Sequence, residues 1–192
     1  MPYTSEHKNA SHKKILASAY ELFSERGYEA VTIDDVMANC KMTRGAFYGH
    51  FKSKAELYRV AIGFAFANSK LVSSRDAEGT PGERLTDILS GYLSIEHVRG
   101  KNPCPLAFLT TDITMRDHAT RRVFSEAYAN VNDMVFEYAG SVTGITREEV
   151  FPLTAMVIGT VALARTISDD AVVEAMLAAC RAQVGERLGI DL

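Results

Sequence analysis

The hydrophobic residues in the N-terminal third of the chain recur every three to four positions, which is the period of an amphipathic helix. A first stripe lies within residues 11–26 and consists of Ile15, Ala19, Leu22 and Phe23. Gly27 follows it, at the position where glycine commonly ends a helix. The pattern predicts a first helix over residues 11–26, preceded by a polar arm over residues 1–9.

Two shorter helices are predicted next. The stripe of the first consists of Ile33, Val36, Met37 and Cys40. Thr32 is a favourable N-cap for it, and Asp35 stands three residues later, where the two side chains can form a capping box. The second helix should begin after Thr43, another N-cap residue, and end near His50. A new helix start follows at Ser53, so the pattern predicts two short helices joined by a tight turn and then a third.

The second short helix has an unusual outer face. Phe47 and Phe51, four residues apart, should point inward. At about 100° per residue, Gly45 and Gly49 then lie on the opposite side. Each glycine lowers the stability of the helix by about 1 kcal/mol relative to alanine. Two glycines are explained if the backbone of this helix must approach another surface closely. Donors to phosphate oxygens or base edges surround this face: Thr43, Arg44, Tyr48, His50, Lys52 and Lys54. A recognition helix in a DNA major groove needs this arrangement.

With this motif, residues 15–57 resemble the DNA-binding domain of the TetR family of bacterial transcriptional regulators. The matching residues are Ile15, Leu16, Ala19, Leu22, Phe23, Gly27, Tyr28, Thr32, Ile33, Asp35, Val36, Thr43, Gly45, Phe47, Tyr48, His50, Phe51, Ser53, Lys54 and Leu57. The resemblance implies that residues 43–50 read the operator and that Thr32, Tyr48 and Lys54 position the phosphate backbone. The resulting set of DNA-binding residues is Thr32, Thr43, Arg44, Gly45, Ala46, Tyr48, Gly49, His50 and Lys54.

The chain departs from the family in the turn. The family usually has Ala-Gly-Val there, where this chain has Cys40, Lys41 and Met42. Glycine adopts a left-handed conformation freely, whereas the same conformation costs Lys41 about 1–2 kcal/mol. The shape of the turn is therefore an open question, although Met42 still supplies its hydrophobic anchor.

The charge distribution agrees with DNA binding by the N-terminal part. The 192 residues carry a net charge of −3. Residues 1–60 hold nine Lys or Arg against seven Asp or Glu (+2), whereas residues 61–192 hold twelve against seventeen (−5). Such an excess of positive charge steers a protein toward phosphates rather than giving tight non-specific binding.

The composition is that of an ordinary globular chain, 47% hydrophobic and 23% charged. The N-terminus lacks a signal-peptide pattern, and the apolar stretch over residues 153–164 is too short to span a bilayer. Three widely spaced cysteines do not form a disulfide framework. We expect a cytoplasmic protein with reduced thiols and no membrane partner.

From Lys54 onward the pattern predicts only helices. A long helix from Lys54 to about Arg75 should carry Leu57, Ala61, Phe64, Leu71 and Val72 on its inner side. Later helices are expected over residues 81–100 and 105–115, from Asp117 or Thr120 to about 140, from Thr146 or beyond Pro152, and after Ser168. The fold class is all-α, with a three-helix helix-turn-helix domain over residues 1–53 and a helical effector-binding and dimerisation domain over residues 54–192.

The last two helices predict a homodimer. Residues 153–164 are apolar nearly all round, so the helix must be buried on every side. A partner's copies of the last two helices would cover it in a four-helix interface about a two-fold axis, and the resemblance implies the same arrangement. The alternative is an internal helix pair in a monomer. The predicted interface residues are Met156, Gly159, Thr160, Leu163, Met176 and Cys180.

The C-terminal part also predicts a cavity for a small-molecule effector. Aromatic residues and a few polar ones lie on helices that should surround one interior, the usual composition of a ligand pocket. They are Phe64, Tyr92, His97, Cys104, Phe108, Thr111, Met115, Phe124 and Tyr128. Each residue alone is ordinary core, and the ligand cannot be identified.

Cys104 allows two interpretations. If a helix begins at Pro105, Cys104 occupies its N-cap, where backbone donors and the helix dipole favour a thiolate. In some branches of the TetR family, a cysteine in this domain senses electrophiles or oxidants, so Cys104 is a candidate switch. The simpler interpretation is a small residue filling a corner between helices.

Enzymatic chemistry is the alternative from another class. Cys104, His97, Asp112 and His118 are the available nucleophile, base or metal ligands, but their spacing fits no known motif. We therefore predict no catalytic residues, no metal and no cofactor. The predicted function is a TetR-like repressor that binds a pseudo-palindromic operator as a homodimer. A small molecule or modification of a cysteine would release it; an activator of the same fold is the alternative.

Overall fold

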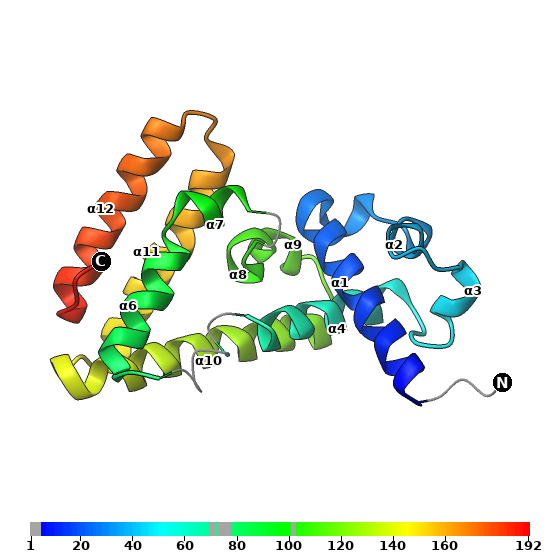
Figure 1. Ribbon diagram of the computed structural model, residues 1–192, viewed down its shortest axis with the longest axis horizontal. Coiled ribbons are helices and arrows are strands. Elements are labelled where there is room, and N and C mark those ends of the chain that lie inside the picture. Colours follow the sequence, from blue (N-terminus) through cyan, green and yellow to red (C-terminus); the bar gives the residue numbers. More distant parts are fainter. Residues whose placement is uncertain (1–4, 70–71, 73–77, 101–102) are drawn as a thin grey trace. The chain divides into compact units, whose positions relative to one another are not determined.

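The computed structural model describes residues 5–69, 72, 78–100 and 103–192, and every regular element within them is a helix (Figure 1). The predicted all-α class is confirmed. Contacts divide the chain into two compact units. The first unit contains Met1–Ala67 and Leu109–Ser125, and the second contains Asn68–Phe108 and Glu126–Leu192. The functional boundary predicted between residues 53 and 54 stays a prediction.

The first unit is built from the N-terminal helices and a later segment of the chain. Its helices are α1 (Ser5–Ala30), α2 (Ile33–Asn39), α3 (Arg44–Phe47), α4 (Lys54–Ala67), α9 (Thr110–Ile113) and the start of α10 (His118–Thr143). The predicted stripes of the first three helices supply its core, which includes Ile15, Phe23, Val36, Met37, Phe47 and Phe51. Leu109 and Ile113 join the same core, 1% and 5% exposed. The segment around α9 is therefore part of the packing that supports α2 and α3.

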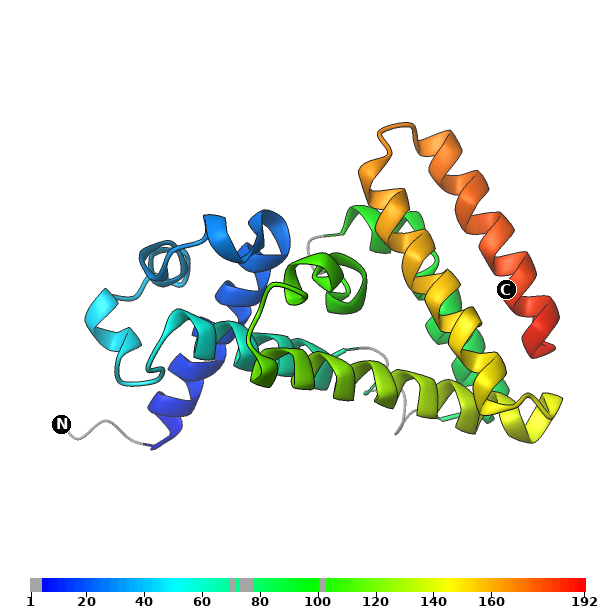
Figure 2. The same cartoon turned by 180° about the vertical axis from the view of Figure 1, so that it is seen from behind.

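The second unit contains the remaining helices. They are α6 (Pro81–Tyr92), α7 (Ile95–Arg99), α8 (Pro105–Phe108), the rest of α10, α11 (Arg147–Thr166) and α12 (Asp170–Leu188). α11 packs along α12, as both views of the ribbon show (Figures 1 and 2). The capping boxes of Thr80 with Glu83 and of Thr146 with Glu149 form at the starts of α6 and α11.

Two of the N-terminal boundaries differ from the prediction. α1 begins at Ser5, inside the expected polar arm of residues 1–9, with an acidic residue in its first turn where the helix dipole favours one. α4 ends at Ala67 instead of continuing to about Arg75. Beyond its end, the Ser69 hydroxyl accepts a hydrogen bond from the backbone N–H of Val72 (3.4 Å). Leu71 and Arg75 lie outside the described residues.

The helix expected over residues 81–100 is divided at Ser94. The Ser94 hydroxyl accepts a hydrogen bond from the backbone N–H of His97 (3.2 Å) and donates one to the carbonyl of Gly91 (2.9 Å). Ser94 thereby caps α7 and ends the helical path of α6. The helix expected over residues 105–115 is likewise divided, into α8 and α9.

The starts of the last three helices follow their caps. Asp117, one of two candidates, caps α10 by accepting a hydrogen bond from the backbone N–H of Thr120 (2.7 Å). Asp169, rather than the predicted Ser168, caps α12. Pro152 lies inside α11, which begins at its capping box and not beyond the proline.

One described helix, α11, is long and apolar enough to cross a membrane by length and composition alone. Only 33% of its most apolar window is buried within the chain. Large hydrophobic side chains are exposed on α11 and α12, among them Phe151, Leu163 and Val172. We call the surface of α11 and α12 that carries Leu163 and Val172 the apolar face.

Candidate nucleic-acid interface

Helix α2 is held by local and longer-range hydrogen bonds. At its start, the Thr32 backbone N–H donates to Asp35 Oδ2 (2.8 Å), and the Asp35 N–H donates to Thr32 Oγ1 (3.1 Å). The bonds from Thr32 hold the pKa of Asp35 below its usual range. Ser18 on α1 donates to the carbonyl of Val36 (2.9 Å) and accepts a hydrogen bond from Asn39 (3.0 Å). The predicted capping box is confirmed, whereas no local pattern pointed to the bonds with α1.

The turn between α2 and α3 keeps a left-handed residue without a glycine. Lys41 has a φ of +57°. The N–H of Lys41 donates to the carbonyl of Ala38 (3.0 Å), and the N–H of Met42 donates to the carbonyl of Met37 (2.8 Å). Lys41 therefore adopts the strained conformation that the sequence left open.

Helix α3 is shorter than predicted. It spans four residues, and turns continue the path to His50, whose N–H bonds the carbonyl of Phe47 (2.9 Å). Such a tightened continuation is common at helix ends. Thr43 is the N-cap residue by position, but within the described part of the chain its hydroxyl makes no capping hydrogen bond.

The faces of α3 are oriented as predicted. Phe47 and Phe51 are buried, 0% and 3% exposed, whereas Gly45 and Gly49 are exposed and the Tyr48 side chain is 60% exposed. The nearest atom to a Cβ added at Gly45 would be Thr43 Oγ1, at 3.9 Å. The packing of the chain therefore leaves room for a side chain at Gly45, and the fold alone does not account for the glycine.

The other predicted DNA-binding residues are divided by exposure. Thr32, Thr43 and Arg44 are exposed, and Ala46, His50 and Lys54 are half-buried. His50 lies near His12, with ring centroids 5.7 Å apart. Burial lowers the pKa of His50, and the neighbouring His12 adds to the effect. Among the residues that the structure describes, His50 Nδ1 is buried without a hydrogen-bond partner.

Lys54 belongs to a group of residues within the first unit that we call the Tyr28 cluster. Its members are Tyr28, Glu29, Lys54, Tyr58, Asp112 and Arg116. Lys54 Nζ lies 4.2 Å from the centroid of the Tyr28 ring, and the Arg116 guanidinium carbon lies 4.3 Å from it. Partial burial lowers the pKa of Lys54.

Ion pairs and a hydrogen bond complete the Tyr28 cluster. Arg116 pairs with Glu29 (2.8 Å) and more loosely with Asp112 (3.7 Å). The buried Tyr58 hydroxyl donates to Asp112, and burial together with this bond raises the pKa of Tyr58. The cluster ties the segment before α10 to α1 and α4. Arg116 and Glu29 are 87 residues apart in the sequence, so no periodic pattern could have revealed the cluster.

The predicted effector residues do not form one group. Phe64 and Phe124 pack against the core of the first unit. Thr111 is exposed and the Met115 side chain is 77% exposed, so neither belongs to the buried core, and their role in a cavity stays a prediction.

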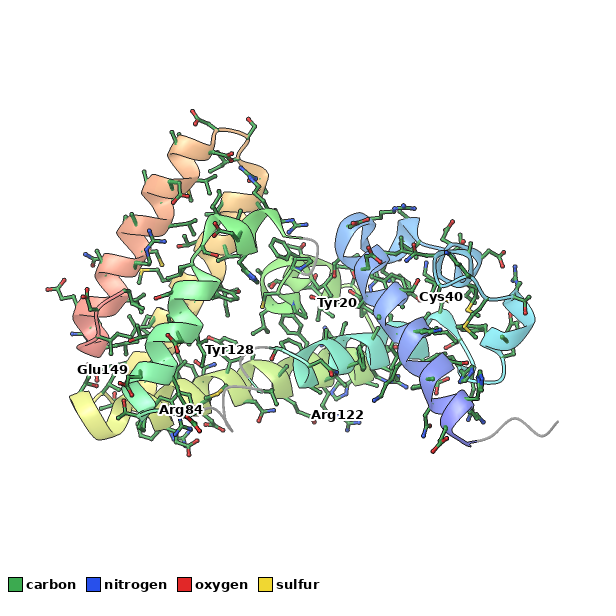
Figure 3. All side chains as sticks on the ribbon, in the orientation of Figure 1. Tyr20, Cys40, Arg84, Arg122, Tyr128 and Glu149 are labelled. Atoms are coloured by element: carbon green, nitrogen blue, oxygen red, sulfur yellow. The ribbon has the colours of Figure 1, made fainter. Side chains whose placement is uncertain are left out.

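The second unit brings part of the predicted set together. The rings of Tyr92 and His97 have centroids 4.7 Å apart, and Tyr92 and Cys104 both pack against the core of this unit. Phe108 lies under the guanidinium of Arg165, 4.7 Å from its carbon. Tyr128, labelled in Figure 3, lies on α10. Its hydroxyl shares a hydrogen bond of 3.2 Å with the hydroxyl of Thr154.

Thr154 also donates to Asn132 Oδ1 (2.7 Å), which extends this contact into a buried polar network. Sequence reasoning missed Asn132 and Thr154. They are polar residues at inward positions of apolar helices, and this placement could have indicated a buried polar network.

Burial raises the pKa of the Cys104 thiol, which is the opposite of the shift expected for an activated cysteine. The helix after it, α8, has only four residues and so supplies little dipole. No group of three or more His, Cys, Asp or Glu side chains able to hold a metal occurs among the described residues. Asp112, the candidate base, lies in the first unit, whereas Cys104 lies in the second. Asp112 accepts a hydrogen bond there from the hydroxyl of Tyr58.

The predicted interface residues lie mostly on the apolar face of α11 and α12. Leu163 is 61% exposed, and Met156, Gly159, Thr160 and Met176 are half-buried. Cys180 is 5% exposed and belongs to the core of its own unit.

The sequence of the N-terminal part of the chain is similar to that of known regulatory proteins. The profile described as "Bacterial regulatory proteins, tetR family" matches residues 15–61. The Transposon Tn10 TetC protein of Escherichia coli is 40% identical over 55 residues, and the uncharacterized HTH-type transcriptional regulator YerO of Bacillus subtilis is 25% identical over 118 residues. The negative regulator IcaR of the Staphylococcus epidermidis biofilm operon is 37% identical over 49 residues. The matches cover 29%, 60% and 26% of this chain and 28%, 41% and 26% of those proteins.

Solved structures extend the likeness of fold to nearly the whole chain. Reduced E. coli NemR has a TM-score of 0.79 at 15% identity, covering 92% of this chain and 96% of that one. A TetR-family regulator from Agrobacterium tumefaciens has a TM-score of 0.77 at 18% identity, covering 93% and 98%. At these identities the likeness shows the fold. The likeness to the tetR family in sequence is carried by residues 15–61, and nearly the whole chain shares the fold of solved TetR-family regulators.

Proposed function

We propose that the protein is a DNA-binding transcriptional regulator that reads its operator with α3. The observation that carries this proposal is the outer face of α3, where two exposed glycines are surrounded by donors on a packed three-helix support. Gly45 has room for a side chain within the chain, so an external surface best explains the glycine. DNA is the surface that these donors fit.

We propose repression as the sign of regulation. The IcaR relative is named a negative transcriptional regulator, and a protein bound at a promoter blocks polymerase. An activator of the same fold remains the second candidate. Within the proposal the protein acts in the cytoplasm and performs no catalysis.

A homodimer is part of the proposal. The apolar face of α11 and α12 exposes Leu163 and Val172, and most of the apolar window of α11 is not buried within one chain. A second copy would cover this face about a two-fold axis. Two α3 helices would then enter successive major grooves about 34–36 Å apart on a pseudo-palindromic site.

Release by a small molecule is the proposed regulation. In the second unit, Tyr92, His97 and Cys104 form a mixed aromatic and polar group that suits ligand binding. The chain runs from Phe108 directly into the segment that the Tyr28 cluster ties to α1 and α4. A shift of this segment would disturb Lys54, a predicted phosphate contact. A hundredfold loss of DNA affinity requires about 2.7 kcal/mol of differential binding between the two states.

Modification of Cys104 is the second proposed route of release. The NemR neighbour was solved in a reduced form. The raised pKa of Cys104 argues for slow reaction with oxidants. If Cys104→Ser leaves an oxidant response of operator binding unchanged, this route is eliminated and the small-molecule route stands.

The test of the proposed function is selection of bound duplexes from random DNA with the purified full chain. We expect a pseudo-palindromic sequence, bound by a dimer. Arg44→Ala should relax the preference at one or two base pairs, whereas Tyr48→Ala should weaken binding to all sequences. A monomer that enriches no sequence at moderate salt would overturn the proposal.

A further inference from the structure

Arg44 is held in place before any DNA is present. Its Nη1 lies 2.6 Å from Oδ2 of Asp34 on α2. The pair of Asp34 and Arg44 links α2 to α3, the two helices of the helix-turn-helix.

The stability of the fold does not account for this ion pair. The side chains of Asp34 and Arg44 are 58% and 59% exposed, and an exposed pair contributes little to folding. A carboxylate beside a DNA-binding helix is also unfavourable for affinity, because it repels phosphates. The position of Asp34 therefore calls for a different role.

The geometry of the guanidinium supplies that role. Arginine presents five N–H donors in one plane, and two of them match O6 and N7 of guanine in the major groove. An unrestrained arginine loses rotamer freedom when it binds. A carboxylate bonded to one nitrogen fixes the plane and leaves donors free on the other side.

We propose that Asp34 is a positioning residue that orients Arg44 for bidentate recognition of a guanine. This inference rests on the proposed function and specifies part of its operator. Asp34 acts through Arg44 and does not itself contact the base. The operator half-site should accordingly contain a guanine whose replacement is sensed by the wild type and not by Arg44→Ala.

The experiment uses the full chain and the duplex recovered by selection, with the guanine assigned to Arg44 replaced by each other base and by 7-deazaguanine. Asp34→Asn should lower the preference for guanine about three- to tenfold. The same variant should bind unrelated DNA more tightly, because one negative charge is lost. Asp34→Glu, which keeps the carboxylate, should retain part of the preference.

Two controls separate positioning from a general charge effect. Glu25→Gln removes an exposed carboxylate of α1 and should leave the preference unchanged. In the Arg44→Ala background, Asp34→Asn should have no further effect on the preference, because the residue through which it acts is gone.

Each outcome has one meaning. If Asp34→Asn raises affinity for all sequences equally and the guanine preference stays, the inference is wrong and Asp34 is only a surface charge. If its effect on preference persists without Arg44, Asp34 contacts a base directly and the positioning role is wrong. If the wild type enriches no sequence, the proposed function fails first, which distinguishes the two failures.

Discussion

Lys41 occupies a backbone conformation that glycine would adopt without strain. Its φ of +57° costs about 1–2 kcal/mol. Lys41→Gly removes this strain but adds about 0.4–1 kcal/mol of chain entropy to the unfolded state. We expect the free energy of unfolding to rise by about 0.5–1 kcal/mol, measured by urea denaturation. Lys41→Ala, which removes the same charge and keeps Cβ, should give no such gain; equal gains would show that strain is not the cause.

At Gly45, a substitution should have opposite effects on the stability of the fold and on the affinity for DNA. Alanine fits within the chain and is the better helix former, so Gly45→Ala should stabilise the fold by up to about 1 kcal/mol. The added methyl would stand between α3 and the DNA, so we expect operator affinity to fall at least about tenfold, or about 1.4 kcal/mol. Thermal melting and a DNA-binding titration measure the two effects.

The matched control for Gly45 is Gly91→Ala. Gly91 lies on α6 of the second unit, and an added Cβ there meets no described atom within 4 Å. It should change stability in the same direction and leave DNA binding unchanged. Unchanged DNA binding by Gly45→Ala would remove the close approach of α3 from the proposed function.

At the level of elements, Arg116 holds the segment before α10 against α1. Its side chain is 13% exposed, pairs with Glu29 and lies over the Tyr28 ring. Arg116→Ala leaves partly buried partners without a cation, so we expect a loss of about 1–3 kcal/mol in the free energy of unfolding. Arg121 is exposed and lies in the first turn of α10. Arg121→Ala should change the free energy of unfolding by no more than about 0.5 kcal/mol. Similar small effects for both would show that the Tyr28 cluster does not anchor the segment.

At the level of the whole molecule, the apolar face of α11 and α12 is the proposed interface of the homodimer. Leu163 is 61% exposed, so Leu163→Glu should leave the core of one chain intact. Burying an unpaired carboxylate in an interface costs several kcal/mol. We therefore expect the variant to sediment as a monomer and to bind its operator weakly. Asn130→Glu, on an exposed position of α10, should stay dimeric. A dimeric Leu163→Glu would place the interface elsewhere.

The local features of the chain were predictable because both partners of each interaction lie within one or two helical turns. The capping boxes of Thr32, Thr80 and Thr146, the inward Phe47 and the outward Gly45 all follow from spacing and rotation. The break at Ser94 escaped prediction. The apolar stripe continues across Ser94, so the periodicity predicted one helix. The single serine that caps the next helix was not recognised as a helix start.

Interactions between distant parts of the chain depended on the fold. Leu109 and Ile113 join the N-terminal core, and Arg116 reaches Glu29, only because folding brings these segments together. The same holds for Asp34 and Arg44, whose approach depends on how α2 and α3 meet at a strained Lys41. Spacing along a helix determines which face a side chain occupies. Which side chain it meets there is decided by the packing of the helices against one another.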